Sequence, residues 1–349
     1  MAEKSKGEYM GRELAEGPDA VTRTIREAVD QVKAAASLLK ELEANGVKRG
    51  YVIGSGTSFH ASLFLQHLFS KYTDFHLAAV PASEFTEWRP AKGKYFIIGY
   101  SQSGESSDIV EAFNVARTMG VKTIAITNTF GSTLSRISDA AIVTRAGEEK
   151  AVAATKTFDV QLAAALALVY TLTGKVFSEI ERASEAAREV LAKKNLLREV
   201  AERYVKAEHA FSLGRGAGYP IALEAALKLK EAAMVHAEGF AVREFLHGPL
   251  QLVDEGTPVF LFAPSRASFE ASIKALERIA GYKAPIILVG PKASEFKDYA
   301  SYSLEVTGAG EDANVIPLVK VAQVFAFYIS VLKGLDPDKP TKLSKVVKY

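Results

Sequence analysis

The stretch from Glu224 to Pro249, EAALKLKEAAMVHAEGFAVREFLHGP, gathers side chains suited to acid–base chemistry. Its apolar residues recur at helical spacing, and Lys228 and Glu231 stand three residues apart, so they can share one face of a helix. His247 follows beside a Gly-Pro turn. This combination of acid, base and cation favours proton transfer. A surface helix with one solvated ion pair would have the same spacing.

A second stretch, SQSGESS from Ser101 to Ser107, follows an apolar strand and precedes a helix. Four hydroxyl groups and the amide of Gln102 surround a glycine there. Because the first N–H groups of a helix and its dipole attract anions, this composition predicts a phosphate site, and a sugar phosphate fits it better than a nucleoside triphosphate. An ordinary capping turn is the alternative, but four hydroxyls exceed what one cap requires.

The stretch GSGTS from Gly54 to Ser58 resembles half of a dinucleotide fingerprint. Phe59 occupies the place of the third glycine, and no P-loop lysine follows, so neither NAD nor ATP is expected. No cofactor is predicted. Thr57 and Ser58 can instead donate to the same anion as the Ser101 loop, because neighbouring strand ends face one crevice in parallel sheets.

The composition excludes several kinds of site and partner. The 349 residues contain no cysteine, which removes disulfides, thiolate catalysis and cysteine-ligated metal centres. His236 and Glu238 could hold a metal, but no second pair supports them, so no metal is expected. A net charge of +2 without a basic block argues against nucleic acid and membranes. The polar N-terminus predicts a cytoplasmic protein, and so does the most apolar run, 160–172, because it is too short to span a bilayer.

These side chains must be positioned by an alternation of short apolar strands and helices. That alternation predicts an α/β fold, with a parallel sheet between helices on both faces. The pattern runs through residue 144 and restarts near residue 210, so we expect two copies of one unit. One amphipathic helix is expected over 18–46 and a long apolar helix over 315–332. The expected strands are 50–53, 76–80, 95–100, 122–126, 140–144, 210–213, 258–263, 285–289 and 303–306.

Several of these motifs resemble the isomerase domain of the glutamine–fructose-6-phosphate aminotransferases (glucosamine-6-phosphate synthases). GRG at 214–216, YPIALEAALKLKEAAMVHAE and HGPLQLVD resemble its second half, and SQSGES and EKAVAATKTFDVQL its first. The resemblance extends from about residue 15 to the C-terminus. It implies two tandem sugar-isomerase (SIS) domains, each a three-layer sandwich. The expected parts are a helical segment 1–46, SIS domains 47–195 and 196–335, and a catalytic tail 336–349.

The resemblance also implies roles for individual residues. Glu231 would be the general base that moves a proton between C1 and C2, with Lys228 beside it. His247 would open the sugar ring, reaching across from the neighbouring subunit of a homodimer. Lys345 would form a Schiff base with the ketose. The sugar phosphate would be bound by Thr57, Ser58, Ser101, Gln102, Ser103 and Ser106, and its hydroxyls would be contacted by Val152, Ala153 and Ala154.

Departures from the synthase pattern decide the expected reaction. The synthase has a glutaminase domain with a cysteine nucleophile, and this sequence shows neither that domain nor a cysteine. The synthase also has a lysine at the position of Leu246 and a serine at the position of Ala154. These features resemble free-standing SIS-type glucosamine-6-phosphate deaminases, which release ammonia and fructose 6-phosphate. The alternatives are a synthase isomerase subunit fed by a separate glutaminase chain, an aldose–ketose isomerase, and a non-catalytic sugar-phosphate sensor. The retained Glu231, His247 and Lys345 argue against the sensor.

Overall fold

The computed structural model describes residues 6–90 and 93–345. The ends of the predicted helical segment and tail, residues 1–5 and 346–349, lie outside the described residues. The contacts divide the chain into two compact units, and the predicted domain boundaries at 46, 195 and 335 stay predictions. Unit 1 comprises Met1–Pro18, Lys150–Thr155 and Arg182–Leu343, and unit 2 comprises Asp19–Glu149, Lys156–Glu181 and Ser344–Tyr349.

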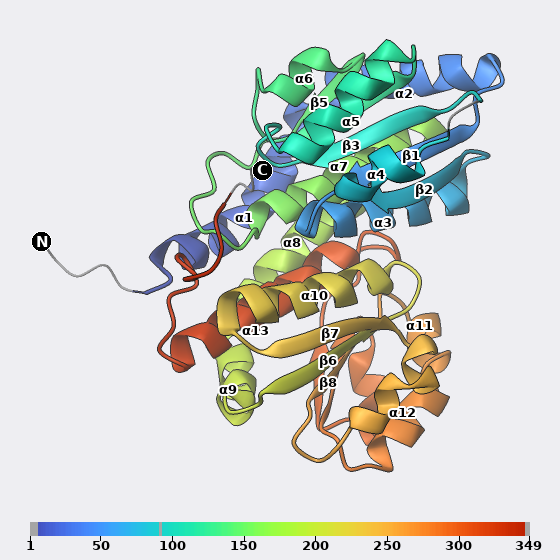
Figure 1. Ribbon diagram of the computed structural model, residues 1–349. Helices are drawn as coiled ribbons and strands as arrows, with labels where there is room; N and C mark the ends of the chain where they lie inside the picture. The colour runs from blue at the N-terminus through green and yellow to red at the C-terminus, as the bar shows by residue number, and fades with distance from the viewer. Residues whose placement is uncertain (1–5, 91–92, 346–349) are drawn as a thin grey trace, which may run out of the picture. The chain divides into compact units, whose positions relative to one another are not determined.

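Unit 2 contains a five-stranded, fully parallel sheet in the order β2-β1-β3-β4-β5 (Figure 1). The contacts place α2, α3 and α7 on one face and α4, α5 and α6 on the other, which gives three layers. The strands are β1 (Arg49–Gly54), β2 (His76–Pro81), β3 (Phe96–Ser101), β4 (Lys122–Thr127) and β5 (Ala140–Val143). The helices are α2 (Val29–Ala44), α3 (Thr57–Tyr72), α4 (Ala82–Trp88), α5 (Ser107–Thr118), α6 (Thr133–Ile137) and α7 (Lys156–Thr173).

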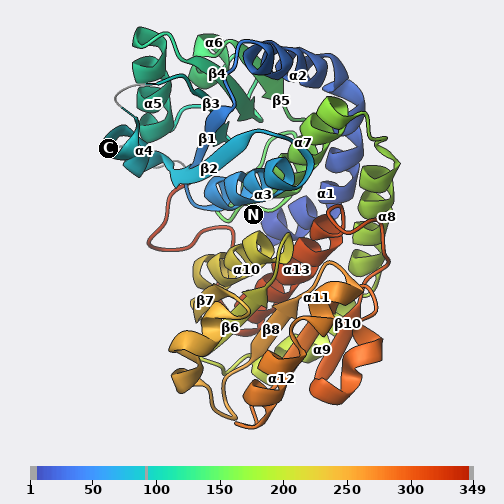
Figure 2. The same ribbon diagram turned by 90° about the vertical axis from the view of Figure 1, so that its right-hand side faces the viewer.

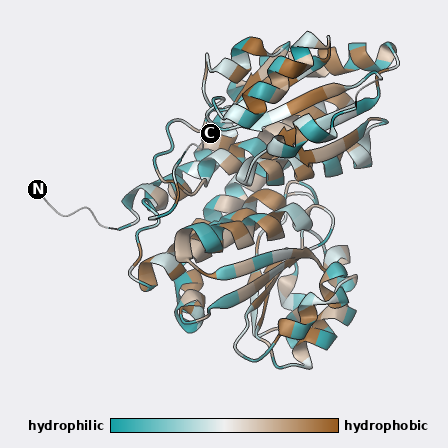
Figure 3. Ribbon diagram, viewed as in Figure 1, coloured by the Kyte–Doolittle hydropathy of each residue, from teal (hydrophilic) through white to brown (hydrophobic). Residues whose placement is uncertain are grey.

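The central strand β3 shows why the sequence folds this way. All six of its residues are buried, and helices cover both faces, so the strand is a continuous apolar run rather than an alternating one. Figure 3 shows brown, hydrophobic colouring along β3, whereas the surrounding helices carry both teal and brown residues. Phe85 of α4 and Phe113 of α5 fill one side of the sheet together with Ile97.

Unit 1 repeats the same topology, with a parallel sheet in the order β10-β9-β8-β6-β7. Figures 1 and 2 show α10 and α13 over one face of this sheet and α11 and α12 over the other. The prediction of two copies of one α/β unit is therefore confirmed. The strands are β6 (His209–Gly214), β7 (His236–Ala241), β8 (Val259–Phe262), β9 (Ile286–Gly290) and β10 (Tyr302–Glu305).

The remaining elements are mostly helical. Three of them are short 3₁₀ helices: η1 (Glu244–His247), η2 (Pro249–Leu252) and η3 (Ala293–Tyr299). The α-helices are α1 (Glu8–Glu27), α8 (Ser178–Ala192), α9 (Lys194–Tyr204), α10 (Gly218–Ala233), α11 (Arg266–Glu270), α12 (Ile273–Ala280) and α13 (Val315–Leu332).

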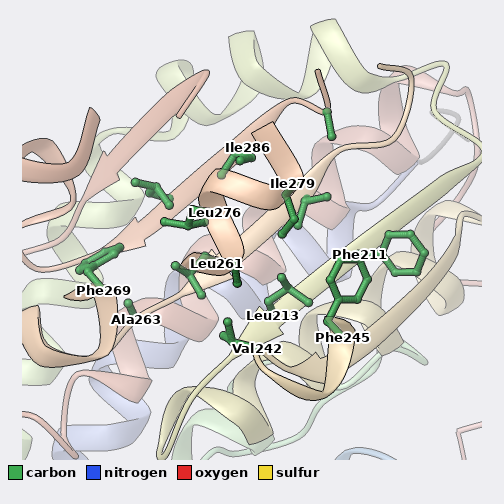
Figure 4. Packing of buried hydrophobic residues seen from close by; sticks show 14 of the residues in the cluster. Phe211, Leu213, Val242, Phe245, Leu261, Ala263, Phe269, Leu276, Ile279 and Ile286 are labelled. Carbon is green, nitrogen blue, oxygen red and sulfur yellow. The ribbon is translucent and has the colours of Figure 1, made fainter. Parts of the chain in front are cut away.

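The core on the α11–α12 face of unit 1 fixes the turn that carries His247. Phe245 of η1 is fully buried, and its ring lies 4.9 Å from that of Phe211 and 5.7 Å from that of Phe240, centroid to centroid. Figure 4 shows Phe245 and Phe211 beside Leu213 in this cluster. The apolar anchor therefore holds η1 against the sheet while the next residues reach the surface.

Three local expectations were wrong. The helix expected over 18–46 is two helices, because α1 ends at Glu27 and α2 starts at Val29. Within the stretch 224–249, where no strand was expected, His236–Ala241 forms the edge strand β7. Its sequence HAEGFA has no β-branched residue, which hid the strand.

The third correction concerns the most apolar segment. It is α13 rather than the run at 160–172. Among the described residues, α13 is the one helix with the length and composition of a membrane span, and 78% of it is buried inside the structure. Burial of that kind is typical of a core helix in a folded domain.

Candidate functional site

The hydroxyl-rich loops of unit 2 lie at the switch point of its sheet. Strands β1 and β3 are parallel neighbours, and the chain leaves β1 through α3 on one face and β3 through α5 on the other. Loops at the carboxyl ends of two such strands form the place where open α/β sheets bind ligands. The structure therefore brings the stretch 55–58 and the stretch 102–106 to the same edge of the sheet.

The Ser101 loop is shaped by hydrogen bonds between its own residues and to the loop after β4. Ser101 Oγ accepts from the backbone N–H of Gly104 at 3.0 Å, and Ser103 Oγ accepts from that of Glu105 at 3.2 Å. The Gln102 carbonyl accepts from the Asn128 N–H at 3.1 Å. Gly104 has a φ of +68°, and a Cβ there would lie 2.2 Å from Ser132 Oγ, so only glycine fits.

The start of α5 is not an ordinary serine-capped turn. Ser106 occupies the N-cap position, but its side chain makes no capping hydrogen bond. The one acidic side chain of the loop, Glu105, is engaged by α6, where its carboxylate accepts from both the N–H and the hydroxyl of Thr133 at 2.8 Å. The capping alternative is thereby weakened, and the composition at the helix N-terminus suits an anion.

Thr57 and Ser58 form the first turn of α3. Gly56 precedes them with a φ of +53°. Ser58 is buried, and its hydroxyl accepts a hydrogen bond from Gln161 Nε2 of α7 at 3.0 Å. Gln161 therefore fixes the orientation of Ser58, and sequence spacing did not indicate this contact because the two residues are 103 positions apart.

The acid–base groups of unit 1 lie on α10. The Lys228 side chain is completely buried, with Nζ 3.3 Å from Glu224 Oε1 and in closer contact with Glu231 Oε2. Glu224 is also completely buried, whereas the Glu231 side chain is 22% exposed. The helix thus exposes part of one carboxylate, that of Glu231, while its two charged partners are buried. The alternative of a solvated ion pair on a surface helix is therefore excluded.

The electrostatics of this triad can be assigned. Burial by itself would lower the pKa of the Lys228 amine, but the carboxylates of Glu224 and Glu231 outweigh that effect and raise the pKa above its ordinary value. Lys228 is therefore a permanent cation at neutral pH. Glu224, four residues before Lys228, is a member of the site that sequence reasoning missed, although the i, i+4 spacing is a signal that could have found it.

Unit 1 places Glu231 and His247 on opposite faces of its sheet. Helix α10, which carries Glu231, packs on one face of the sheet, while η1, which ends at His247, packs through Phe245 against the cluster on the α11–α12 face. The strands of the sheet therefore lie between the two elements that carry these residues. His247 itself is exposed at the end of η1.

The loop with Val152, Ala153 and Ala154 belongs to unit 1. Its start is held by Glu13 of α1, a buried residue whose carboxylate accepts from the N–H groups of Lys150 at 2.5 Å and Ala151 at 3.2 Å. Its end is held by Gln323 of α13, whose Nε2 donates to the Thr155 carbonyl at 3.1 Å. Buried polar side chains thus fix this loop at both ends.

Lys345 lies in unit 2, together with the phosphate loops. Its Nζ is 2.6 Å from Oε2 of Glu149, whose side chain is completely buried. The structure therefore places the predicted site residues in two groups. Unit 2 holds Thr57, Ser58, Ser101, Gln102, Ser103, Ser106 and Lys345, and unit 1 holds Val152, Ala153, Ala154, Lys228, Glu231 and His247.

A pair of histidines lies away from these groups. His209 and His236 are opposite each other at the starts of β6 and β7, with their Nδ1 atoms 3.2 Å apart, and both are exposed. Within residues 6–90 and 93–345, no group of three or more His, Asp or Glu side chains is arranged to hold a metal ion.

Comparison with known proteins identifies the family. The SIS domain model matches residues 45–192 and 203–333. A glutamine–fructose-6-phosphate aminotransferase (isomerizing) of Aquifex aeolicus (strain VF5) is 35% identical over 351 residues, which cover 97% of this chain and 57% of that protein. The chain thus spans less than two thirds of that relative's length. The C-terminal domain of glucosamine-fructose-6-phosphate aminotransferase from Francisella tularensis superposes with a TM-score of 0.83 at 28% identity, covering 95% of this chain and 98% of that one.

A glucosamine-6-phosphate deaminase from Thermotoga maritima is also similar, with a TM-score of 0.72 over 93% of this chain and 99% of that one. Its identity of 23% shows a shared fold alone. The comparisons therefore support the isomerase alternative better than the deaminase prediction. With two matches to the family model and one parallel sheet in each unit, this chain belongs to the SIS-domain family and contains two SIS domains.

Proposed function

We propose that this chain moves a proton between C1 and C2 of a six-carbon sugar 6-phosphate, interconverting a ketose and an aldose or its amino derivative. The observation that carries the proposal is the α10 triad, in which a partly exposed Glu231 is anchored on the buried cation Lys228 and the buried Glu224. The names of its relatives, isomerizing aminotransferases of fructose 6-phosphate, support fructose 6-phosphate as the ketose.

The phosphate group would be bound at the switch point of unit 2. Ser106 leaves the start of α5 without a side-chain cap, and hydroxyl donors without fixed charge surround it. The groups proposed to bind the phosphate are Thr57, Ser58, Ser101, Gln102, Ser103 and Ser106, and the backbone of Val152, Ala153 and Ala154 is proposed to contact the sugar hydroxyls.

Glu231 is the proposed general base. Its carboxylate takes the proton from one carbon and returns it to the next through an enol or enolamine, and Lys228 holds the carboxylate in place. The amine of Lys345 condenses with the ketose carbonyl, which makes the neighbouring C–H more acidic. No step requires a metal or an organic cofactor.

His247 is the proposed ring-opening acid or base, supplied by the second subunit of a homodimer. The support is that α10 with Glu231 and η1 with His247 pack on opposite faces of one sheet, so that a single unit 1 does not bring both residues to one sugar. On this proposal the dimer is a condition of activity.

The source and fate of ammonia distinguish the two remaining functions, the isomerase part of an aminotransferase and a deaminase. If the chain is the isomerase part of an aminotransferase, it exchanges protons and uses ammonia supplied by a glutaminase chain or domain. If it is a deaminase, a reading supported by Leu246 and Ala154, it releases ammonia from glucosamine 6-phosphate without a partner. We place the isomerase reading first because the named relatives are isomerizing aminotransferases.

Proton exchange in D₂O tests the proposal directly. NMR should show deuterium entering C1 of fructose 6-phosphate or C2 of glucosamine 6-phosphate with the wild type, and Glu231→Gln should slow this exchange by about 10²–10⁴-fold. Glu238→Gln, the same change at a 46% exposed side chain on β7, is the matched control. Ammonia is measured in parallel.

Three outcomes are decisive. Exchange that persists in Glu231→Gln overturns the role of Glu231. A wild type that binds both sugars without exchanging any proton favours the sensor. Ammonia release from glucosamine 6-phosphate by the chain alone replaces the isomerase reading with the deaminase.

A further inference from the structure

The contact between Lys345 and Glu149 joins two residues that are 196 positions apart in the chain. Nζ and Oε2 are 2.6 Å apart, the Glu149 side chain is completely buried, and the Lys345 side chain is 24% exposed. A completely buried carboxylate is costly to desolvate, so its partners matter to the protein. The lysine, by contrast, remains accessible to a small molecule.

Glu149 is held rigidly by the start of α7. Its Oε1 accepts from the Thr157 N–H at 3.1 Å, and its Oε2 accepts from the Thr157 hydroxyl at 2.6 Å. These bonds satisfy a free N–H of the first helical turn, as a cap does. The oxygen that receives the Thr157 hydroxyl also receives the Lys345 ammonium, so the position of the amine is tied to the end of a buried helix.

We infer that Glu149 is the positioning residue of Lys345, holding its amine in place and accepting its proton when the amine reacts. This inference rests on the proposed function, because it deepens the role of Lys345 there. A buried carboxylate used only as a helix cap needs no cation in contact with it, and a capping Gln could serve as well, accepting from the Thr157 N–H with Oε1 and donating to the Thr157 hydroxyl with Nε2. The ion pair with a residue from the far end of the chain is the feature that capping leaves unexplained.

The step balances in atoms and charge. The Lys345 ammonium transfers one proton to the Glu149 carboxylate, which leaves a neutral amine and a carboxylic acid. The amine attacks the ketose carbonyl, a C–N bond forms, and water leaves as the imine forms. The carboxylic acid returns its proton to the imine nitrogen, which gives the iminium ion and restores the carboxylate.

Borohydride trapping measures this step. Wild type and variants are incubated with fructose 6-phosphate and sodium borohydride, and peptide mass spectrometry quantifies the reduced adduct on Lys345. Glu149→Gln can still accept from the Thr157 N–H and can donate to the Thr157 hydroxyl, but it removes the charge, so it should slow adduct formation by about 10- to 100-fold. Glu149→Asp keeps the charge one methylene shorter and should recover part of the rate.

Two controls separate positioning from a structural role. Glu148→Gln makes the same chemical change at the exposed neighbour and should leave the rate unchanged. Thr157→Val removes one bond to Glu149 and keeps its charge, so it should lower the melting temperature without a comparable loss of adduct. The dissociation constant for sorbitol 6-phosphate, which has no carbonyl, should be the same in Glu149→Gln and wild type.

The outcomes are distinguishable. An adduct that forms in Glu149→Gln at the wild-type rate overturns this inference and leaves the proposed function intact. A wild type that forms no adduct on Lys345 overturns the proposed role of Lys345 and this inference together, while proton exchange by Glu231 remains separately measurable. If Thr157→Val loses adduct as strongly as Glu149→Gln, the effect is structural and positioning by charge is refuted.

Discussion

Replacing Lys228 with methionine removes the cation at the centre of the α10 triad while keeping the length of the side chain. Glu224 is then left completely buried without its positive partner. Removing one member of a buried ion pair costs about 3–5 kcal/mol, because the other charge stays out of water. For a folded unit of roughly 150–250 residues, each kcal/mol lowers the melting temperature by about 2–4 °C, so we expect a drop of roughly 6–20 °C.

The second substitution in this test is Glu224→Leu. In the double variant Lys228→Met/Glu224→Leu, no buried charge is left without a partner, and Glu231 is partly exposed to water. Well-packed apolar replacements of a buried pair are often neutral or stabilising. The double variant should therefore regain at least half of the stability lost by Lys228→Met, although proton exchange stays lost.

Thermal and urea unfolding followed by far-UV circular dichroism measure these changes. The only tryptophan, Trp88, lies in unit 2, so its fluorescence reports on the unit that does not contain the substitution. If Lys228→Met lowers the free energy of unfolding by less than about 1 kcal/mol, the triad is not a buried charge network. A double variant that is no more stable than Lys228→Met would refute the same reasoning.

The same triad predicts how stability depends on pH. Burial lowers the pKa of Lys228, but the carboxylates of Glu224 and Glu231 raise it by more than burial lowers it. The pKa in the folded state therefore lies above the ordinary 10.5. Stabilisation by the pair is fully present below the ordinary value and is lost as the pH rises through the raised value. The wild type should lose this contribution on the alkaline side, and Lys228→Met should show no such loss.

Two further predictions concern the loop and the dimer. Gly104→Ala forces a positive φ and a Cβ 2.2 Å from Ser132 Oγ, so it should cost about 1–3 kcal/mol and raise the KM for the sugar phosphate more than it lowers kcat; an unchanged KM would contradict a phosphate site at this loop. Mixing inactive Glu231→Gln and His247→Asn chains should restore part of the activity, because a mixed dimer has one site with both native groups. No recovery from mixed dimers verified by mass spectrometry would refute a His247 shared across subunits.

The alternation of apolar strands and helices could be predicted well from the sequence, because burial on both faces makes a parallel strand a continuous apolar run. Strand β3 and the helix after it illustrate this, and the SQSGESS loop between them was recognisable from its composition. The edge strand β7 could not be predicted, because HAEGFA is short, partly exposed and poor in β-branched residues. Its place depends on pairing with β6, which is a long-range contact.

The sequence by itself determined the repeated α/β pattern, the hydroxyl-rich loop at a helix N-terminus and the Lys228–Glu231 spacing, because each depends on residues within a few turns of one another. Only the tertiary structure decided that Glu224 and Lys228 are completely buried, that Glu231 and His247 lie on opposite faces of one sheet, and that Lys345 contacts Glu149. Burial depends on what packs against an element, and a contact across 196 residues depends on the whole path of the chain between them. Neither the burial nor the long-range contact can be deduced from the spacing of residues within one element.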